Sequence, residues 1–122
     1  MKTAYDKIKP YTTKDGSVIR ELMHPGAHGH DNAKLSLAEA TVSAGSATFL
    51  HKHQRSDEIY HIIAGTGIMI LGDKRFTIVA GNTIFIPRGT PHNIENTGRA
   101  LIKVLCCCSP PYSHDDTKLL TE

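Results

Sequence analysis

The residues His51-Lys52-His53-Gln54-Arg55-Ser56-Asp57-Glu58 (HKHQRSDE) form the stretch from which the fold and the site are best predicted. In an extended strand, side chains two positions apart point to the same face, so His51 and His53 can aim at one point while Lys52 turns away. A short polar turn then brings Glu58 back beside the two histidines, at the start of the next apolar run. Together with the lone His92, these residues predict a site for one divalent metal ion.

Short apolar or alternating runs, separated by glycine, proline and polar turns, continue on both sides of this stretch, which is typical of a sandwich or barrel of strands. The predicted strands cover residues 17–23, 35–42, 47–51, 58–63, 67–71, 75–79, 83–86 and 101–106. Helix is expected only in residues 115–120, because Asp115 and Asp116 suit a helix start. We expect an all-β fold with little helix, and a single domain over residues 1–122.

The composition excludes several classes of protein. The chain of 122 residues is 39% hydrophobic and 21% charged, which is typical of a globular protein. The formal net charge of +2, with scattered basic residues and no tryptophan, argues against binding to nucleic acid. Apolar runs are all shorter than the roughly 20 residues of a membrane helix. The polar start of the chain lacks the features of a signal peptide. We therefore expect no membrane partner and a cytoplasmic protein.

The predicted ligands belong to two longer patterns, over residues 45–65 and 81–96. The first pattern is Gly45-x5-His51-x-His53-x4-Glu58-x6-Gly65. The second is Gly81-x5-Pro87-Arg88-Gly89-x2-His92-x3-Asn96. These patterns resemble the two sequence motifs of the cupin superfamily, with every defining position filled and the short spacer of small microbial members.

The resemblance implies a small antiparallel β-barrel of the jelly-roll type, with His51, His53, Glu58 and His92 as metal ligands. It also implies a small-molecule ligand or substrate, and a homodimer formed through edge strands. Three imidazoles and a carboxylate suit Mn, Fe, Co, Ni, Cu or Zn better than Ca or Mg, and ligand type alone cannot choose among the six. Four protein ligands around an octahedral ion would leave two positions for water, oxygen or substrate.

Strand alternation predicts which residues surround the metal ion. The pocket candidates are Phe49, Tyr60, Ile62, Val104 and Cys106. Tyr60 is interpreted either as a hydrogen-bond donor to a ligand or as an aromatic filler of the barrel. The consecutive cysteines would alternate, with Cys106 and Cys108 inside and Cys107 outside, either as small buried residues or as neighbours of the metal ion. The expected pocket is mostly apolar, and only Arg20 could bring a positive charge to it.

Three functions remain open at this point. An apolar pocket with a metal ion favours a metal-dependent oxidoreductase of the dioxygenase kind. The alternatives are a non-catalytic cupin that binds a small ligand, and a sugar isomerase or epimerase resembling mannose-6-phosphate isomerase. A sugar phosphate would need basic groups that the predicted interior lacks. The segment with His24, His28 and His30 is interpreted as a solvated loop, with a lid or a second metal site as alternatives.

Overall fold

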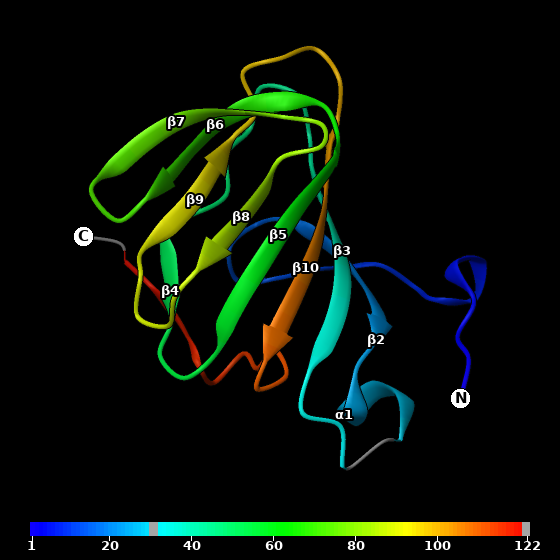
Figure 1. Cartoon of the computed structure of the whole chain (residues 1–122). Coiled ribbons are helices and arrows are strands. Elements are labelled where there is room, and N and C mark those ends of the chain that lie inside the picture. The colour runs from blue at the N-terminus through cyan, green and yellow to red at the C-terminus, as the bar shows by residue number, and fades with distance from the viewer. Residues whose placement is uncertain (30–31, 121–122) are drawn as a thin grey trace.

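The computed structural model describes residues 1–29 and 32–120, which form two antiparallel sheets that face each other (Figure 1). The six-stranded sheet has the order β1-β2-β3-β10-β5-β8. Its strands are β1 (Tyr11–Thr12), β2 (Val18–Met23), β3 (Ser36–Val42), β5 (Asp57–Ala64), β8 (Thr83–Ile86) and β10 (Ile102–Ser109).

The five-stranded sheet has the order β11-β4-β9-β6-β7. Its strands are β4 (His51–His53), β6 (Thr66–Leu71), β7 (Lys74–Val79), β9 (His92–Glu95) and β11 (Thr117–Leu119). Helix is limited to the 3-10 turn η1 (Tyr5–Lys7) and the short α1 (Pro25–His28). The arrangement is that of the predicted jelly roll. None of the helices among the described residues has the length and apolar character needed to cross a membrane.

The core lies between the two sheets and follows strand alternation. In β5 and β10 every second residue is buried, and Cys106 pairs with Tyr60 in the register of the two strands. The same register brings Cys108 opposite Glu58, so the buried faces of both strands meet in one interior. The largest fully buried side chains are Ile62, Met69, Ile78, Ile86, His92, Ile102 and Val104. The inward faces predicted for these two strands are confirmed.

Several elements differ from the predictions. Residues 47–50 do not form a continuous strand, because Ala47 makes only an isolated bridge with Glu95 and the regular pairing of β4 begins at His51. β9 was not expected, since the prolines before it hide its short alternation. Residues 115–120 form a turn and β11 instead of a helix, because Thr117 to Leu119 pair with His53 to His51. The segment around His24 contains the short helix α1, and its His30 lies outside the described residues.

Close backbone packing requires glycine at the turn between β5 and β6. Gly65 has φ of +90°, and a Cβ atom built on it would lie 2.5 Å from the carbonyl oxygen of Leu101. Any larger residue would therefore combine a strained backbone with a steric clash. This glycine fixes the connection through which the chain passes from one sheet to the other.

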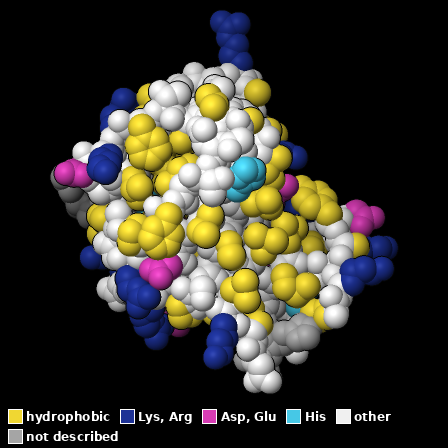
Figure 2. Space-filling view, in the orientation of Figure 1, with side chains coloured by type: hydrophobic (Ala, Val, Ile, Leu, Met, Phe, Trp, Pro, Cys, Tyr) yellow, Lys and Arg dark blue, Asp and Glu magenta, His cyan; other side chains and the backbone are white. Residues whose placement is uncertain are grey.

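The outward face of the six-stranded sheet carries many hydrophobic side chains (Figure 2). Phe85, Ile59 and Leu37 are 57%, 44% and 36% exposed. The strand registers align them across the sheet, because Phe85 pairs with Ile59, and Cys107 pairs with both Ile59 and Leu37. We call these four residues the outer apolar row.

Candidate metal centre

The three histidines of the two motifs meet between the sheets. His51 and His53 lie at the two ends of β4, and His92 begins β9 directly opposite His51 in the register of the strands. All three are buried, and one ligand nitrogen from each lies within 4.8 Å of the other two. Two nitrogens bound to one ion at ~2.1 Å lie at most about 4.2 Å apart, so a modest contraction would bring all three onto a metal ion.

Each imidazole is oriented by a hydrogen bond from its Nδ1 atom, on the side away from the other rings. His51 Nδ1 contacts the carbonyl oxygen of Phe49 at 2.8 Å, and His92 Nδ1 contacts that of Thr90 at 2.9 Å. These carbonyls can only accept, so the Nδ1 atoms carry the protons. The remaining Nε2 lone pairs are therefore free for a metal ion, which is the arrangement expected of metal-binding histidines.

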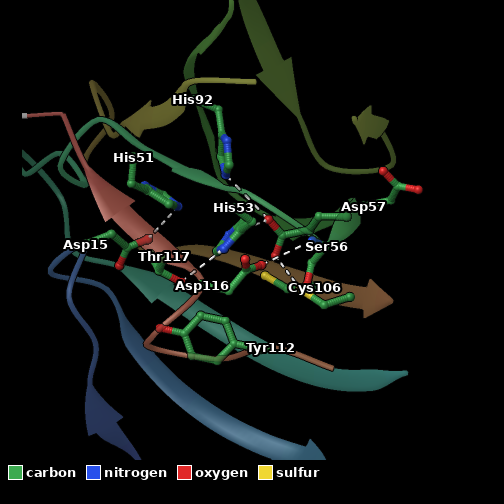
Figure 3. Close-up of polar contacts among 12 residues, drawn as sticks. Asp15, His51, His53, Ser56, Asp57, His92, Cys106, Tyr112, Asp116 and Thr117 are labelled. Carbon is green, nitrogen blue, oxygen red and sulfur yellow. Dashed lines mark hydrogen bonds and ion pairs between the residues drawn. The ribbon is translucent and has the colours of Figure 1, made fainter. Parts of the chain in front are cut away.

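His53 is oriented by a side chain from the end of the chain. Its Nδ1 atom lies 3.0 Å from Thr117 Oγ1, whose own proton is donated to the carbonyl oxygen of Ser113 at 2.8 Å. The threonine oxygen therefore accepts from His53, and the Nε2 atom of His53 is left unprotonated like those of the other two rings. Figure 3 shows the contact between His53 and Thr117 as a dashed line.

Glu58 lies beside two of the three histidines. Its Oε1 atom is 3.2 Å from His53 Nε2 and 3.4 Å from His92 Nε2, and its Oε2 atom accepts from the Cys108 thiol at 3.1 Å. Among the described residues, Glu58 Oε1 and His92 Nε2 are buried without a hydrogen-bond partner. Two unpartnered acceptor atoms that face each other are costly unless a cation lies between them. The donor set therefore fits a divalent transition metal.

The electrostatics of the cluster agree with this arrangement. Burial, together with the neighbouring His92, lowers the pKa of His51 to about 4, so His51 is neutral at pH 7. Burial opposes ionisation of Glu58, yet the neighbouring His53 and His92 hold its pKa well below the usual range. Although burial lowers the pKa of His53, the Glu58 carboxylate raises it overall. The neutral His51 and the ionised Glu58 are in the protonation states that a metal ion requires.

Residues 109–117 tie the site to the rest of the barrel. The buried Asp116 carboxylate accepts from the backbone N–H of Arg55 at 2.9 Å and from that of Ser56 at 3.1 Å. These bonds fix the turn between His53 and Glu58 and, at the same time, the position of Thr117. The ring of Tyr112 lies edge-on to His53, with 5.8 Å between the ring centroids. The segment thus supports one ligand and covers the cluster.

A cavity opens next to the histidines, and its wall is more polar than the sequence predicted. The lining residues with carboxylates or hydroxyls are Thr13, Asp15, Ser17, Glu21, Ser36, Glu58, Tyr60, Tyr112 and Thr117. The remaining lining residues are Ile19, Ala38, Ala40, His51, His53, Cys106 and Cys108. The expectation of a mostly apolar pocket holds for the surface that the cavity exposes, but β2 and the loop before it bring acidic and hydroxyl groups to one wall, which the sequence did not predict.

The pocket candidates are distributed differently from the expectation. Tyr60 and Cys106 line the cavity, whereas Ile62 and Val104 lie on the same faces farther along their strands and belong to the core. Phe49 is a correction, since its side chain is 55% exposed. It precedes β4, and its ring packs near Gly16 outside the barrel. Arg20 also points away, because its guanidinium stacks on the ring of Tyr5.

Sequence reasoning missed Asp15, Glu21, Tyr112 and Thr117. Asp15 was read only as part of an Asp-Gly turn, yet its Oδ2 atom lies 3.6 Å from His51 Nε2 (Figure 3). Glu21 could have been found, because it alternates with Ser17 and Ile19, whose side chains face inward. Tyr112 and Thr117 had no local signal, since their positions depend on contacts made across the whole fold.

Comparison with known proteins places this site in a wider group. The family model described as Cupin domain matches residues 38–108. An uncharacterized protein of Methanocaldococcus jannaschii is 57% identical over 120 residues, which are 98% of this chain and 94% of that protein. The oxalate-binding protein of Thermotoga maritima is 38% identical over 76 residues, 62% of each chain.

A solved structure supports the same relationship. The crystal structure of a predicted oxalate decarboxylase from Thermotoga maritima superposes with a TM-score of 0.75 and 28% identity, over 90% of this chain and 99% of that one. The match of the family model includes all four predicted ligands. Of the other cavity residues with carboxylates or hydroxyls, Tyr60 also lies within the matched range. The rest lie outside that range: Thr13, Asp15, Ser17, Glu21, Ser36, Tyr112 and Thr117.

Proposed function

Because the chain belongs to the cupin family, we propose that it is a metal-dependent enzyme in which His51, His53, Glu58 and His92 bind one divalent transition metal ion. The observation that carries this proposal is the set of three Nδ1 hydrogen bonds, which leave three Nε2 lone pairs free, two of them beside the unpartnered Oε1 atom of Glu58. When bound, the metal ion would act as a Lewis acid that polarises an oxygen atom of a small substrate.

The substrate is expected to be neutral or to carry a positive charge. None of the described residues that line the cavity is lysine or arginine, while three carboxylates (Asp15, Glu21 and Glu58) contribute to its wall. A phosphorylated sugar or a dicarboxylate such as oxalate would meet these negative charges without a basic partner. The names of the oxalate-related proteins are therefore a poor guide to the substrate of this chain.

Asp15 supports proton transfer as the reaction. Its Oδ1 atom accepts from the backbone N–H of Ser17 at 2.9 Å, and from the hydroxyls of Ser17 at 2.6 Å and Thr13 at 2.7 Å. Its Oδ2 atom is left beside His51 Nε2 at 3.6 Å, a distance too long for a hydrogen bond. This oxygen can accept a proton from a substrate held at the histidine cluster.

The test measures deuterium incorporation and metal content together. Protein loaded with Zn²⁺ would be incubated in D₂O with small hydroxy, oxo and amino compounds, and the exchange of C–H hydrogen would be followed by mass spectrometry. We expect exchange that requires the metal ion and falls at least about 100-fold in Asp15→Asn, the usual range for a lost general base. Metal content of that variant should remain at the wild-type level, and Asp73→Asn, in the exposed β6–β7 turn, is the matched control.

Two outcomes would replace the proposal with an alternative. Oxygen uptake by the Fe²⁺-loaded protein, without exchange, would identify an oxidoreductase. Tight binding of a compound with neither exchange nor oxygen uptake would identify a non-catalytic ligand-binding protein.

A further inference from the structure

Glu21 is a buried carboxylate that the metal site does not use. It belongs to β2, where Ile19 and Glu21 face the interior and Arg20 faces away, and its side chain lines the cavity. Glu21 is only 9% exposed. The hydroxyl of Tyr11 donates to its Oε1 atom at 2.7 Å, whereas the Oε2 atom is buried without a partner within residues 1–29 and 32–120. A buried carboxylate oxygen that lacks a donor is a vacant place for a ligand's N–H or O–H group.

Glu21 lies at the boundary between two pockets. Glu21 and Tyr112 line both the inner cavity and an open outer groove, whose other walls are Tyr11, His24, Gly26, Ala27, Ser113, His114 and Asp115. Glu21 and Tyr112 therefore separate the groove from the cavity beside the histidines.

Charge and aromatic rings select the kind of donor. The inner cavity holds the carboxylates of Asp15, Glu21 and Glu58, and the rings of Tyr60 and Tyr112, with no lysine or arginine among its described lining residues. One divalent ion offsets only two of the three negative charges. Carboxylates beside aromatic faces are the surroundings that an ammonium group prefers, and a hydroxyl gains less from them.

The cavity is small. It leaves about 40 Å³ for the centres of water-sized molecules. A ligand of a few non-hydrogen atoms suits this space, and a nucleotide is too large for it.

We propose that Glu21 binds the protonated amine of a small amino alcohol or amino acid whose oxygen atom is held at the metal site. This inference rests on the proposed function, since it names the substrate class of the same cavity. Glu21 fixes one end of the substrate, and Tyr11 holds the carboxylate in the orientation that leaves Oε2 free.

Calorimetric titration of Zn²⁺-loaded protein at pH 7 tests the inference with matched pairs of ligands. Ethanolamine is compared with ethylene glycol, and glycine with glycolate, so that each pair differs by an amine against a hydroxyl. We expect each amine to bind at least about tenfold more tightly than its partner, as a charge-assisted bond replaces a neutral one. In Glu21→Gln the preference should fall below about threefold. Glu39→Gln is the control, because Glu39 is also 9% exposed and also accepts from a tyrosine hydroxyl, but faces the other side of the sheet.

The outcomes that overturn the inference are distinct from those that overturn the metal site. Equal binding of amines and hydroxyl compounds, a preference that survives in Glu21→Gln, or no amine binding at 10 mM would each refute the role of Glu21. If the wild-type protein retained no metal, the proposed function would fail instead. The amine preference would then be decided by methylammonium against methanol in the metal-free protein.

Discussion

Replacement of Thr117 by valine tests the orientation of the metal ligands through one buried atom. The change keeps the shape of the side chain in β11 but removes the oxygen that accepts from His53 Nδ1 at 3.0 Å. Thr117 is 2% exposed, so water cannot easily take the place of that oxygen. A buried N–H group left without an acceptor costs about 1–3 kcal/mol, which corresponds to roughly 5–150-fold in affinity. We expect metal binding to weaken by about 10–100-fold, the range known for partners of metal-binding histidines.

The assay is competition for Zn²⁺ between the protein and a chromogenic chelator, with protein stability followed in parallel by thermal unfolding. Thr83→Val is the matched control, because Thr83 Oγ1 contacts His61 Nδ1 at 2.8 Å in the same way on the exposed side of the sheet. Thr117→Ser retains the hydroxyl and should restore most of the affinity. Wild-type zinc affinity in Thr117→Val, or an equal loss in Thr83→Val, would refute the reasoning.

Three further predictions concern stability and assembly. Burial opposes ionisation of Asp116, but the backbone N–H groups of Arg55 and Ser56 lower its pKa in the folded protein. The ionised carboxylate therefore stabilises the fold at pH values above its unfolded pKa of about 3.9. This stabilisation is lost as the pH falls through the pKa of Asp116 in the folded protein. Thermal unfolding of Asp116→Asn should show a deficit of about 1.5–3 kcal/mol at pH 7 that shrinks toward pH 3, and a deficit independent of pH would count against this. In urea unfolding, Gly65→Ala should lower the free energy of unfolding by at least about 3 kcal/mol, because the clash with Leu101 adds to the strain of the positive φ. Gly81→Ala should lower it by only about 1 kcal/mol, because Gly81 also has a positive φ, of +96°, but no atom lies within 4 Å of an added Cβ. Equal losses in the two variants would exclude the clash. We propose that the outer apolar row mediates a homodimer, so light scattering of the wild-type protein should give twice the 13.3 kDa mass of the chain. Phe85→Lys should shift the mass to that of the monomer, whereas Lys103→Glu should not. A monomeric wild-type protein would exclude this dimer.

The sequence predicted most of the fold because the strands of the interior alternate regularly. Tyr60 and Ile62 face inward, and His61 faces outward, as the period of two requires. Cys106 and Cys108 are inside, and Lys103 lies on the outward side, for the same reason. Asn96, the last position of the second motif, donates from its side-chain amide to the backbone carbonyls of Val42 and Ala100.

The composition of the cavity wall could not be predicted in the same way. Phe49 was assigned by extending the alternation of His51 and His53 backward, but the backbone N–H of Phe49 bonds the carbonyl oxygen of Asp15, and Phe49 lies in the irregular stretch between the isolated bridge at Ala47 and β4. Asp15 and Thr117 reach the site from opposite ends of the chain. Their roles follow from long-range contacts, such as that of Asp116 with Arg55, which no local pattern encodes.

The central claim is that four residues bind one metal ion, and a crystal structure with anomalous difference maps recorded across the absorption edges of Mn, Fe, Co, Ni, Cu and Zn tests it most directly. The account predicts a single strong peak between the Nε2 atoms of His51, His53 and His92, with the Glu58 carboxylate as the fourth protein ligand. A structure of protein grown with these metals that shows no peak there, or a peak whose ligands exclude His92 or Glu58, would contradict it.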